Sequence, residues 1–579
     1  MTPIDTEVLV VGAGLTGATA SLLLARHGIK TMMISRGRWV ADSPRAHIVN
    51  QRTMEVMRSI GLEERCYAAA TPGDQMANHT MMTAVNGVEF GRLWTWGNDP
   101  ARAGEYAFSP GKGCDLPQDR FEPILVNEAM VRGVVTRFAT AFVSLEQDDE
   151  GVTTTLEDMV TGARFTVRSR YVIGADGGQS PVATAIGLPF SGEAGIAPAL
   201  NVRFRADLSR YFRDRPGSIF WIFQPGREGR IGNAMLRMVQ PWYDWVIGFV
   251  HLGESVTQLS PEALEQEVRN ILQDDDIPIE ITGVYSWRIN HVLAERYSAG
   301  RVLCAGDAVH RHPPMNGLGG NTCVQDAFNL AWKIAAVLRW NAGDALLETF
   351  DAERRPVGRH VIDRALAGWH QNPDVVRSLG IDPAAPAEER ARQFNVLFED
   401  SDEGEARRDA FEKAKRSKIF SYHAHGTEMN QVYASTAVVD EGAAPIAYAR
   451  DPELYYQPSS RPGARVPHIW VRRQGRTIST LDLCHPERFT LLARTRGAAW
   501  IEAAARVAEE TGVPLDAYRV GLGTEVADLY GTFGDAAEIG ETGCLLVRPD
   551  QFVAWRRSAM PEDPHDALLT ALRSCLSMA

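Results

Sequence analysis

The feature that most constrains the fold is a glycine string near the N-terminus, placed between an apolar strand and an apolar helix. The strand is Val8–Val11, and residues 12–17 read GAGLTG, a G-x-G-x-x-G pattern. In a βαβ unit, Gly12 allows the sharp turn, Gly14 lets a pyrophosphate approach the backbone, and Gly17 lets the helix pack close to the strand. The segment therefore predicts a Rossmann-like domain that binds a dinucleotide. A purely structural turn of another α/β protein is the alternative.

The second strand of this unit, expected over residues 29–34, lacks the carboxylate that usually follows it and holds a ribose hydroxyl. Here the strand ends in Ile34-Ser35-Arg36. We expect Ser35 to bond a hydroxyl in place of the carboxylate, and Arg36 to approach the phosphate side of the adenosine.

Two later strand ends also carry glycine and aspartate. Residues 171–177 read YVIGADG, and a strand expected over 301–305 leads into GDAVHRHPPMNGLGGN at 306–321. Glycine and proline weaken regular secondary structure, so a segment this rich in them indicates a fixed turn or a close approach. Three such strand ends, spread over about 300 residues, predict one large cofactor wrapped by a discontinuous domain.

Charge and cysteine content exclude several classes of protein. The net charge of −13 repels polyanions, so we expect no nucleic-acid partner. Seven scattered cysteines without a C-x-x-C pair argue against a disulfide framework or a structural zinc site and predict a cytoplasmic protein. The uncharged run at 8–25 is interrupted by three glycines, so we expect no membrane segment.

The rest of the chain divides by pattern. Residues 197–251 alternate like an antiparallel sheet that could roof an apolar ligand, and 371–440 read as charged helices. Residues 455–579 look like a separate small α/β unit. Its expected strands cover 489–493, 544–547 and 552–555, and its expected helices cover 498–511 and 563–575.

Taken together, these motifs resemble the single-component FAD-dependent aromatic hydroxylases. GAGLTG, the Asp-Gly strand end, and RVLCAGDAVHRHPPMNGLGGN followed by TCVQDAFNLAWKI match that family's three fingerprints in order. PRAHIVNQRTMEVM at 44–57, CDLPQDRFEPIL at 114–125 and RPGARVPHIW at 461–470 resemble its phenol ortho-hydroxylase branch. The resemblance covers nearly the whole chain.

The resemblance implies an α/β fold of the para-hydroxybenzoate-hydroxylase type. A Rossmann-like FAD-binding domain (1–80, 106–185 and 286–370) would carry an inserted antiparallel-sheet substrate domain (81–105 and 186–285). A helical connection (371–440) would lead to a thioredoxin-like C-terminal domain (441–579). Because that last domain lacks C-x-x-C, we expect it to support the structure or a homodimer rather than redox chemistry.

The resemblance also implies roles for residues along the chain. Asp307 would accept hydrogen bonds from the flavin ribityl chain, and Pro314 would form a wall beside the flavin ring and the substrate. The helix expected to start at Asn321 would direct its positive end at the flavin pyrimidine. The further expected cofactor contacts are Gly12, Gly14, Gly17, Ser35, Arg36, Arg45, Gln51, Gln118, Asp176, Gly306, Gly317, Gly319 and Gly320.

The chemistry implied is phenol hydroxylation. NADPH or NADH would reduce FAD, and O₂ would give a flavin C4a-hydroperoxide that attacks the ortho carbon of a phenolate. The site then needs a group that takes the phenolic proton. The candidates are His47 and Asp115, with either one as the base or Asp115 acting through His47. Trp221 and Arg237 on the expected roof sheet are candidate contacts of substrate or nicotinamide. Ala183 stands where the family commonly has arginine, so the choice of nicotinamide stays open.

Other functions remain as alternatives. A natural-product aromatic could replace a simple phenol as the substrate, and a flavin-binding redox sensor or assembly protein would not turn phenols over. Trp94-Thr95-Trp96 matches the start of the W-x-W-x-I-P motif of flavin-dependent halogenases. Gly97 and the residues after it do not continue that motif. A nicotinamide dehydrogenase would need only the first glycine motif, so it would not account for the glycine- and proline-rich segment at 306–321. His310 and His312 lack a third ligand, so we expect no metal.

Overall fold

The glycine string lies at the centre of a six-stranded sheet, as predicted. β2 (Val8–Val11) pairs in parallel with β3 (Thr31–Ile34) and β12 (Tyr171–Gly174), and β12 pairs in parallel with β19 (Val302–Cys304). β8 (Val135–Arg137) and β18 (Ser298–Ala299) complete the edges. Because parallel strands end at the same edge of a sheet, the three glycine-bearing strand ends meet there. The computed structural model describes residues 4–227, 232–250, 260–440, 442 and 444–578.

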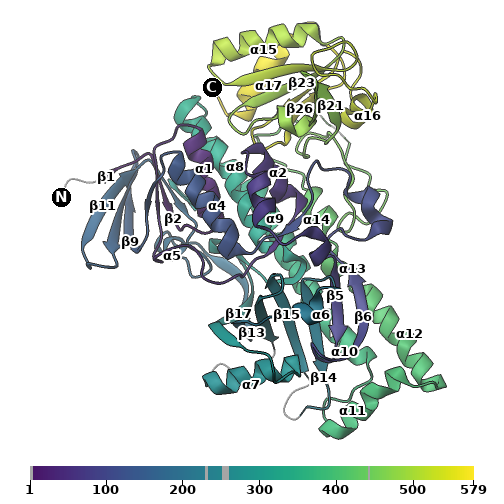
Figure 1. Ribbon diagram of the computed structural model, residues 1–579. Helices are drawn as coiled ribbons and strands as arrows, with labels where there is room; N and C mark the ends of the chain where they lie inside the picture. The colour runs from purple at the N-terminus through teal and green to yellow at the C-terminus, as the bar shows by residue number, and fades with distance from the viewer. Residues whose placement is uncertain (1–3, 228–231, 251–259, 441, 443, 579) are drawn as a thin grey trace.

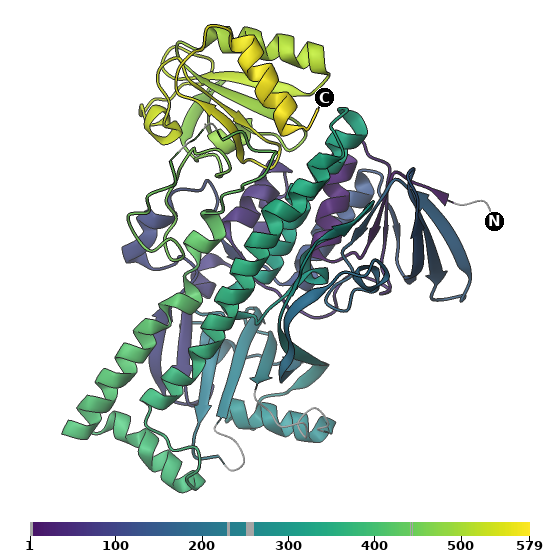
Figure 2. The same cartoon turned by 180° about the vertical axis from the view of Figure 1, so that it is seen from behind.

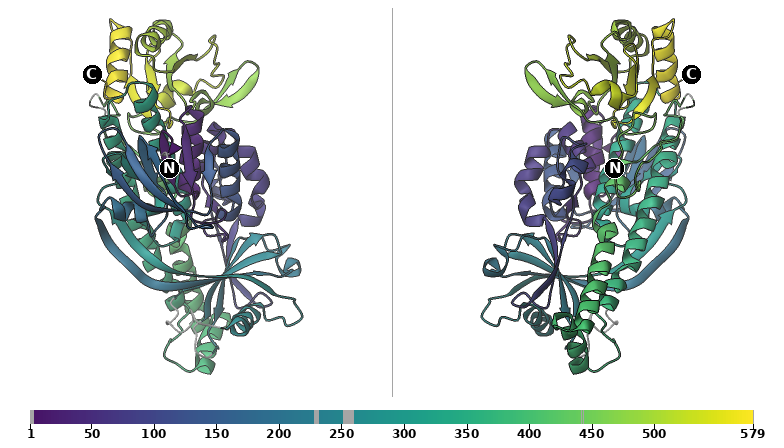
Figure 3. Two further views of the ribbon diagram at one scale, coloured as in Figure 1. Left: turned by 90° about the vertical axis from the view of Figure 1, so that its left-hand side faces the viewer. Right: turned by 90° about the vertical axis from the view of Figure 1, so that its right-hand side faces the viewer.

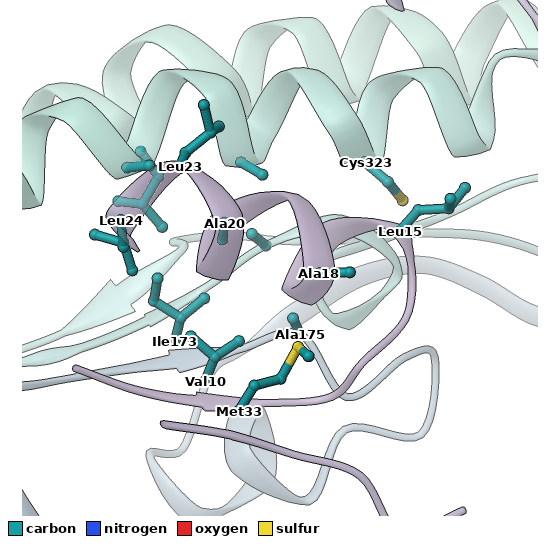
Figure 4. Close-up of a cluster of buried hydrophobic side chains, with 14 of the residues drawn as sticks. Val10, Leu15, Ala18, Ala20, Leu23, Leu24, Met33, Ile173, Ala175 and Cys323 are labelled. Atoms are coloured by element: carbon teal, nitrogen blue, oxygen red, sulfur yellow. The ribbon is translucent and has the colours of Figure 1, made fainter. Parts of the chain in front are cut away.

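Buried apolar side chains fix the position of the helix that follows the glycine string. α1 (Leu15–Arg26) packs onto the sheet beneath α8 (Gly319–Arg339) and beside α4 (Gln118–Val131). Figure 4 shows this layer: Leu23 points from α1 toward α8, and Leu24 lies on the side of α1 nearer Ile173 and Val10, all in one buried cluster. The packing holds the N-terminus of α1 against the sheet edge where the strand ends meet.

A four-stranded sheet that the sequence reading did not anticipate flanks this domain. β1 (Ile4–Asp5) pairs with β11 (Arg164–Ser169), which pairs with β10 (Val152–Asp158) and through it with β9 (Thr140–Gln147). The helices α2 (Gln51–Ser59), α3 (Glu63–Ala69) and α5 (Pro181–Ala185) and the short pair β4 (Ile48–Val49) and β7 (Cys114–Asp115) complete the domain.

The predicted antiparallel sheet is confirmed and is larger than expected. It contains β13 (Phe190–Arg205), β14 (Ile219–Gln224), β15 (Gly232–Gln240) and β16 (Asp244–Val250). It also recruits β5 (Asn78–Met82), β6 (Glu89–Trp94), β17 (Glu280–Ala294) and β20 (His310–Arg311). β5 and β17 run across the domain boundaries expected at 80/81 and 285/286, so both domains share these strands.

One face of this sheet is a closed apolar core, and the opposite face is available to the site. Phe204, Phe220 and Trp245 are buried on the closed face with α6 (Ser209–Phe212) and α7 (Pro261–Leu272). Strand alternation sends Arg237 and Trp221 to the opposite face. That second face contacts residues 375–411 near Trp221 and residues 44–45 at Arg237, and its predicted role as a roof over a ligand stays a prediction.

Helices connect the sheet with the C-terminal unit. α9 (Ala345–His370) starts beside that unit and ends at the sheet, where Trp369 packs with Ile289 (Figure 2). The expected charged helices are α10 (Asn372–Ser378), α11 (Ala387–Asn395), α12 (Asp402–Ser417), α13 (Ile419–Tyr422) and α14 (His425–Met429). The glycine-string domain lies between the C-terminal unit and the antiparallel sheet (Figures 1 and 3).

The C-terminal unit has the thioredoxin-like topology predicted. β23 (Phe489–Arg494) pairs in parallel with β24 (Leu515–Val520) and antiparallel with β25 (Cys544–Val547), which pairs with β26 (Val553–Arg557). α15 (Ala498–Thr511), α16 (Phe533–Ala537), α17 (Pro564–Cys575) and the hairpin β21 (Trp470–Arg473) and β22 (Arg476–Ser479) complete it. β24 was not expected from the sequence.

Candidate active site

The glycines of the predicted cofactor cradle lie where no side chain fits. Gly12 has φ +114°, and a Cβ there would collide with the carbonyl of Ala175, at the end of the neighbouring strand. A Cβ on Gly17 would collide with the carbonyl of Gly12. The N-cap residue Gly14 makes no side-chain hydrogen bond to α1, and the Leu15 N–H bonds the Glu122 carboxylate, so the following N–H groups of the first turn can bind phosphate. These residues fit a dinucleotide pyrophosphate.

The Gly306-Asp307 turn, which follows β19, forms another side of the same cradle. Gly306 has φ +66°, and a Cβ there would collide with Thr16 Oγ1 in α1. Asp307 is exposed, with Cys323 Sγ 3.7 Å from its Oδ1, so its carboxylate can accept hydrogen bonds from a ligand. Ser35 and Arg36 follow β3 at the same edge of the sheet. Their position is consistent with the adenosine end of the cofactor.

A glutamate that the sequence reading missed reaches this cradle. Glu122, on α4, accepts hydrogen bonds from Ala41 N at 2.7 Å and from Gln118 Nε2 at 2.5 Å. A Cβ on Gly14 would lie 3.4 Å from its Oε1. Burial raises the pKa of this carboxyl, while the nearby cation of Arg45 lowers it. The signal available in the sequence was its position one helical turn after Gln118.

The Pro-Pro turn packs against the segment that carries His47. Gly317 has φ +62°, and a Cβ there would lie 3.0 Å from Ile48 Cβ; a Cβ on Gly320 would lie 3.0 Å from Ala46 Cβ. Pro314, in this turn, is exposed. α8 begins at Gly319, two residues before the predicted start at Asn321. No side chain caps α8, which leaves its N-terminal N–H groups for a ligand.

The side chains of three predicted cofactor residues hydrogen-bond to other groups of the protein. Gln51 accepts from His425 Nε2 at 2.9 Å and donates to two carbonyls. Asn321 donates to Ile48 O and Gly317 O and accepts from two groups of the 50–53 turn. Asp176 accepts from Ser180 Oγ and Val182 N at the start of α5. All three side chains therefore have structural partners beside the cradle, and their predicted contacts with the cofactor stay a prediction.

The catalytic candidates His47 and Asp115 are in direct contact. β4 pairs with β7, and His47 Nδ1 lies 3.0 Å from Asp115 Oδ2. Asp115 is fully buried, and Leu116 N donates to His47 O at 2.7 Å. Burial lowers the pKa of His47, while Asp115 raises it and Arg237 lowers it. A neutral imidazole that donates from Nδ1 to the carboxylate presents Nε2 as a proton acceptor.

Arg237 is a buried cation close to this pair. Its guanidinium donates to the carbonyls of Pro44 and Arg45, the former by a short contact and the latter at 2.9 Å. Burial lowers its pKa to about 10, so it stays charged at neutral pH. Its hydrogen-bond acceptors are neutral carbonyls, and its charge acts on the nearby carboxylate of Asp115 and on groups beside His47.

Two aromatic side chains line the same sheet face. Trp221 lies one row from Arg237 and packs beside the cluster that Phe223 and Phe411 form. His79, which the sequence reading missed, is 2% exposed on β5, and its ring centroid lies 4.0 Å from that of Tyr422. Its strand joins the sheet through a parallel pairing with β14, far away in the sequence. No local motif indicates this.

A buried ionic chain supports the Gly-Asp turn from behind. Asp326 on α8 accepts from Gly306 N at 3.0 Å and contacts His310 Nε2 at 2.9 Å. Arg354 Nε donates to the other oxygen of Asp326 at 2.8 Å, and Arg354 Nη1 donates to Tyr433 OH at 3.0 Å. The Tyr433 ring stacks on Phe552 of the C-terminal unit at 4.0 Å. The C-terminal unit thus contacts the cofactor turn through this chain.

Two kinds of feature, a metal-binding cluster and a bilayer-spanning helix, are not found among the described residues. In those ranges, no group of three or more His, Cys, Asp or Glu is arranged to hold a metal ion. His310 instead contacts Asp326, and His312 contacts its neighbouring carbonyl. All seven cysteines are buried and unbonded. None of the described helices combines the length and apolar character needed to span a bilayer.

Comparison with known proteins agrees with this geometry. Residues 5–365 match the family of FAD binding domains, and residues 459–579 match the aromatic-ring hydroxylase C-terminal family. The chain is 45% identical over 580 residues to 2,4-dichlorophenol 6-monooxygenase of Delftia acidovorans, covering 100% of this chain and 99% of the relative. It is 39% identical over 578 residues to phenol 2-monooxygenase of Pseudomonas sp. (strain EST1001), covering 99% and 93%.

A solved structure shows the same fold. The crystal structure of the flavin-dependent monooxygenase PieE in complex with FAD and substrate superposes with a TM-score of 0.95 at 39% identity, covering 100% of both chains. The cradle residues fit FAD; the first family match covers the glycine-string domain together with the antiparallel sheet, and the second covers the C-terminal unit. The chain therefore belongs to the FAD-dependent aromatic-ring hydroxylases.

Proposed function

We propose that this protein uses NAD(P)H and O₂ to hydroxylate a substituted phenol at its ortho carbon and forms a catechol. The observation that carries the proposal is the His47–Asp115 pair, with its 3.0 Å contact, beside the Pro-Pro turn of the FAD cradle. A phenol becomes a strong carbon nucleophile when its proton is removed. A site that holds a neutral, oriented imidazole meets that requirement.

Each group of the pair has a distinct part. Asp115 holds Nδ1–H of His47, which fixes the tautomer and stabilises the imidazolium that forms when Nε2 takes the phenolic proton. The charge of Arg237, near this pair, favours the phenolate over the neutral phenol. A phenol has a pKa near 10, so this cation helps to offset the mismatch with histidine.

FAD supplies the redox chemistry when it is bound and reduced, because it activates O₂ for transfer of one oxygen atom. The protein contributes the cradle around Gly12 and Gly306, the acceptor carboxylate of Asp307, and the uncapped N-termini of α1 and α8. The antiparallel sheet covers the other side and excludes water. The choice between NADH and NADPH stays open.

The test is a panel of phenols with the purified FAD-loaded protein. Catechol formation and peroxide release would be scored together under NADH and under NADPH. We expect phenol-stimulated NAD(P)H oxidation coupled to catechol, with one oxygen atom derived from ¹⁸O₂. Flavin-bound protein whose NAD(P)H oxidation no phenol stimulates would favour the non-catalytic redox-sensor alternative.

We also propose a homodimer in the cytoplasm. The seven buried, unbonded cysteines support a reducing compartment. Sedimentation analysis and cell fractionation would test these two points separately.

A further inference from the structure

His79 lies on the same sheet face as Arg237 and has unused hydrogen-bonding capacity. It is 2% exposed, and neither Nδ1 nor Nε2 has a hydrogen-bond partner among the described residues. Leaving a buried polar group unpaired costs about 1–3 kcal/mol. Buried polar groups in native proteins are nearly always paired, so an external partner is expected here.

The strand registers place His79 in one row with Arg237. His79 pairs with Ile219, and Ile219 pairs with Arg237. The row continues through Val246 to Arg203. Neighbouring strands are about 4.8 Å apart, so about 10 Å separate the backbones of His79 and Arg237.

The loop that carries His47 runs along this row toward His79. Arg203 Nη1 donates to Asp42 O at 3.1 Å, and Arg237 donates to the carbonyls of Pro44 and Arg45. Residues 42–45 therefore run along this row from Arg203 to Arg237, and His47 follows two residues later. The charges agree with this placement, because Arg237 lowers the pKa of His47 and His47 lowers the pKa of His79.

His79 is held neutral by its surroundings. Burial lowers its pKa well below 6.5, and the neighbouring His47 and Lys418 lower it further. Two aromatic rings also lie near it, Tyr422 at 4.0 Å and Trp96 at 6.0 Å between ring centroids. The indole N–H of Trp96 is also buried without a hydrogen-bond partner in the described ranges. One donor and one acceptor on His79, and a second donor on Trp96, thus lie unused near each other.

We propose that His79 forms a polar subsite for a second hydrogen-bonding substituent, such as a hydroxyl or carbonyl group, on the phenol whose own hydroxyl is held by His47. The inference rests on the proposed function, since it assumes that a phenol occupies the site. A chlorine or alkyl substituent would leave the ring nitrogens unpaired. A phenol with a second polar group would pair them, so the protein discriminates between these two substrate classes.

The test compares pairs of phenols that carry hydroxyl or acetyl in place of chlorine at the same ring position. Purified FAD-loaded wild type, His79→Leu and His79→Gln would be assayed for catechol-forming kcat/KM, with FAD content measured for each. Met81→Leu is the matched control, because Met81 lies on the same strand and face but is apolar. We expect wild type to favour the polar member of at least one pair by 10-fold or more.

His79→Leu should reduce that ratio at least 10-fold, His79→Gln should retain part of it, and Met81→Leu should leave it within about 3-fold. An unchanged ratio in His79→Leu would overturn the inference and indicate that water satisfies the imidazole. An equal loss of kcat/KM for every phenol, including the unsubstituted one, would also overturn the inference. His79 would then act on the hydroxyl that all these phenols share. If wild type hydroxylates no phenol at all, the proposed function fails instead, and the two outcomes are distinguishable.

Discussion

His47 and Asp115 meet across two short paired strands, with Nδ1 of the imidazole 3.0 Å from Oδ2 of a fully buried carboxylate. The contact uses Nδ1, which leaves Nε2 of His47 available to accept a proton. This geometry separates two tasks, because the carboxylate orients the ring and the imidazole accepts the proton.

Asp115→Asn should lower kcat for catechol formation about 10²-fold, within the range observed for loss of general-base function. The amide no longer fixes the Nδ1–H tautomer or stabilises the imidazolium. Rapid-quench kinetics with FAD-loaded protein would measure the effect. Asp119→Asn is the control, because that carboxylate pairs with Arg203 instead of His47. Equal losses in both variants would exclude a specific role for Asp115.

The pH dependence of kcat/KM should report His47 in the free enzyme. Burial lowers its pKa below 6.5, so the base is neutral and active at pH 7 to 8, and activity is lost as the pH falls through the lowered value. Asp115 raises that pKa, so Asp115→Asn should move the acid limb to still lower pH. An acid limb that lies above pH 7, or that Asp115→Asn does not move, would contradict the assignment.

Gly306→Ala should yield protein poor in FAD. The new Cβ meets Thr16 Oγ1 at a residue with φ +66°, so either the turn or the start of α1 must move. Flavin absorbance per mole of protein measures the outcome. Gly28→Ala provides the control, since Gly28 has φ +70° but no atom within 4 Å of the added Cβ. It should cost about 1–2 kcal/mol in stability and keep its flavin.

Asp326→Asn should weaken FAD binding at least 10-fold. An amide cannot accept simultaneously from Gly306 N, His310 and Arg354 as the carboxylate does. Glu353→Gln breaks a comparable buried ion pair with Lys333 without touching the turn. Each variant should lose about 3–5 kcal/mol of unfolding free energy, but only Asp326→Asn should change the FAD dissociation constant. Equal FAD loss in both would reduce the role of Asp326 to general stability.

The sequence was sufficient for features that depend on local pattern. The strand–glycine–helix unit, the alternation over 197–251 and the helices of the C-terminal unit follow from periodicity and turn chemistry, and the structure has them close to the expected limits. The roles of Gly12, Gly17 and Gly306 were also predictable. Each stands in a motif position where a side chain would collide with neighbouring atoms, so the motif itself indicates why glycine is needed.

Features that depend on long-range pairing were not accessible from the sequence. Gln51, Asn321 and Asp176 lie in the predicted cofactor motifs, but the motifs do not indicate which protein groups these side chains bind. Asn321 bonds groups of the 50–53 turn about 270 residues away. His79 reaches the site only because β5 pairs with β14. The ionic chain from Asp326 to Tyr433 joins segments that no local pattern relates.

The most direct test of the account is a crystal structure of the FAD-loaded protein with a bound phenol. The account predicts that the phenolic oxygen lies within about 2.6–3.2 Å of His47 Nε2, with the ring between the flavin and the sheet face that carries Arg237. A phenol whose hydroxyl contacts another group while His47 Nε2 is left unpaired would contradict it.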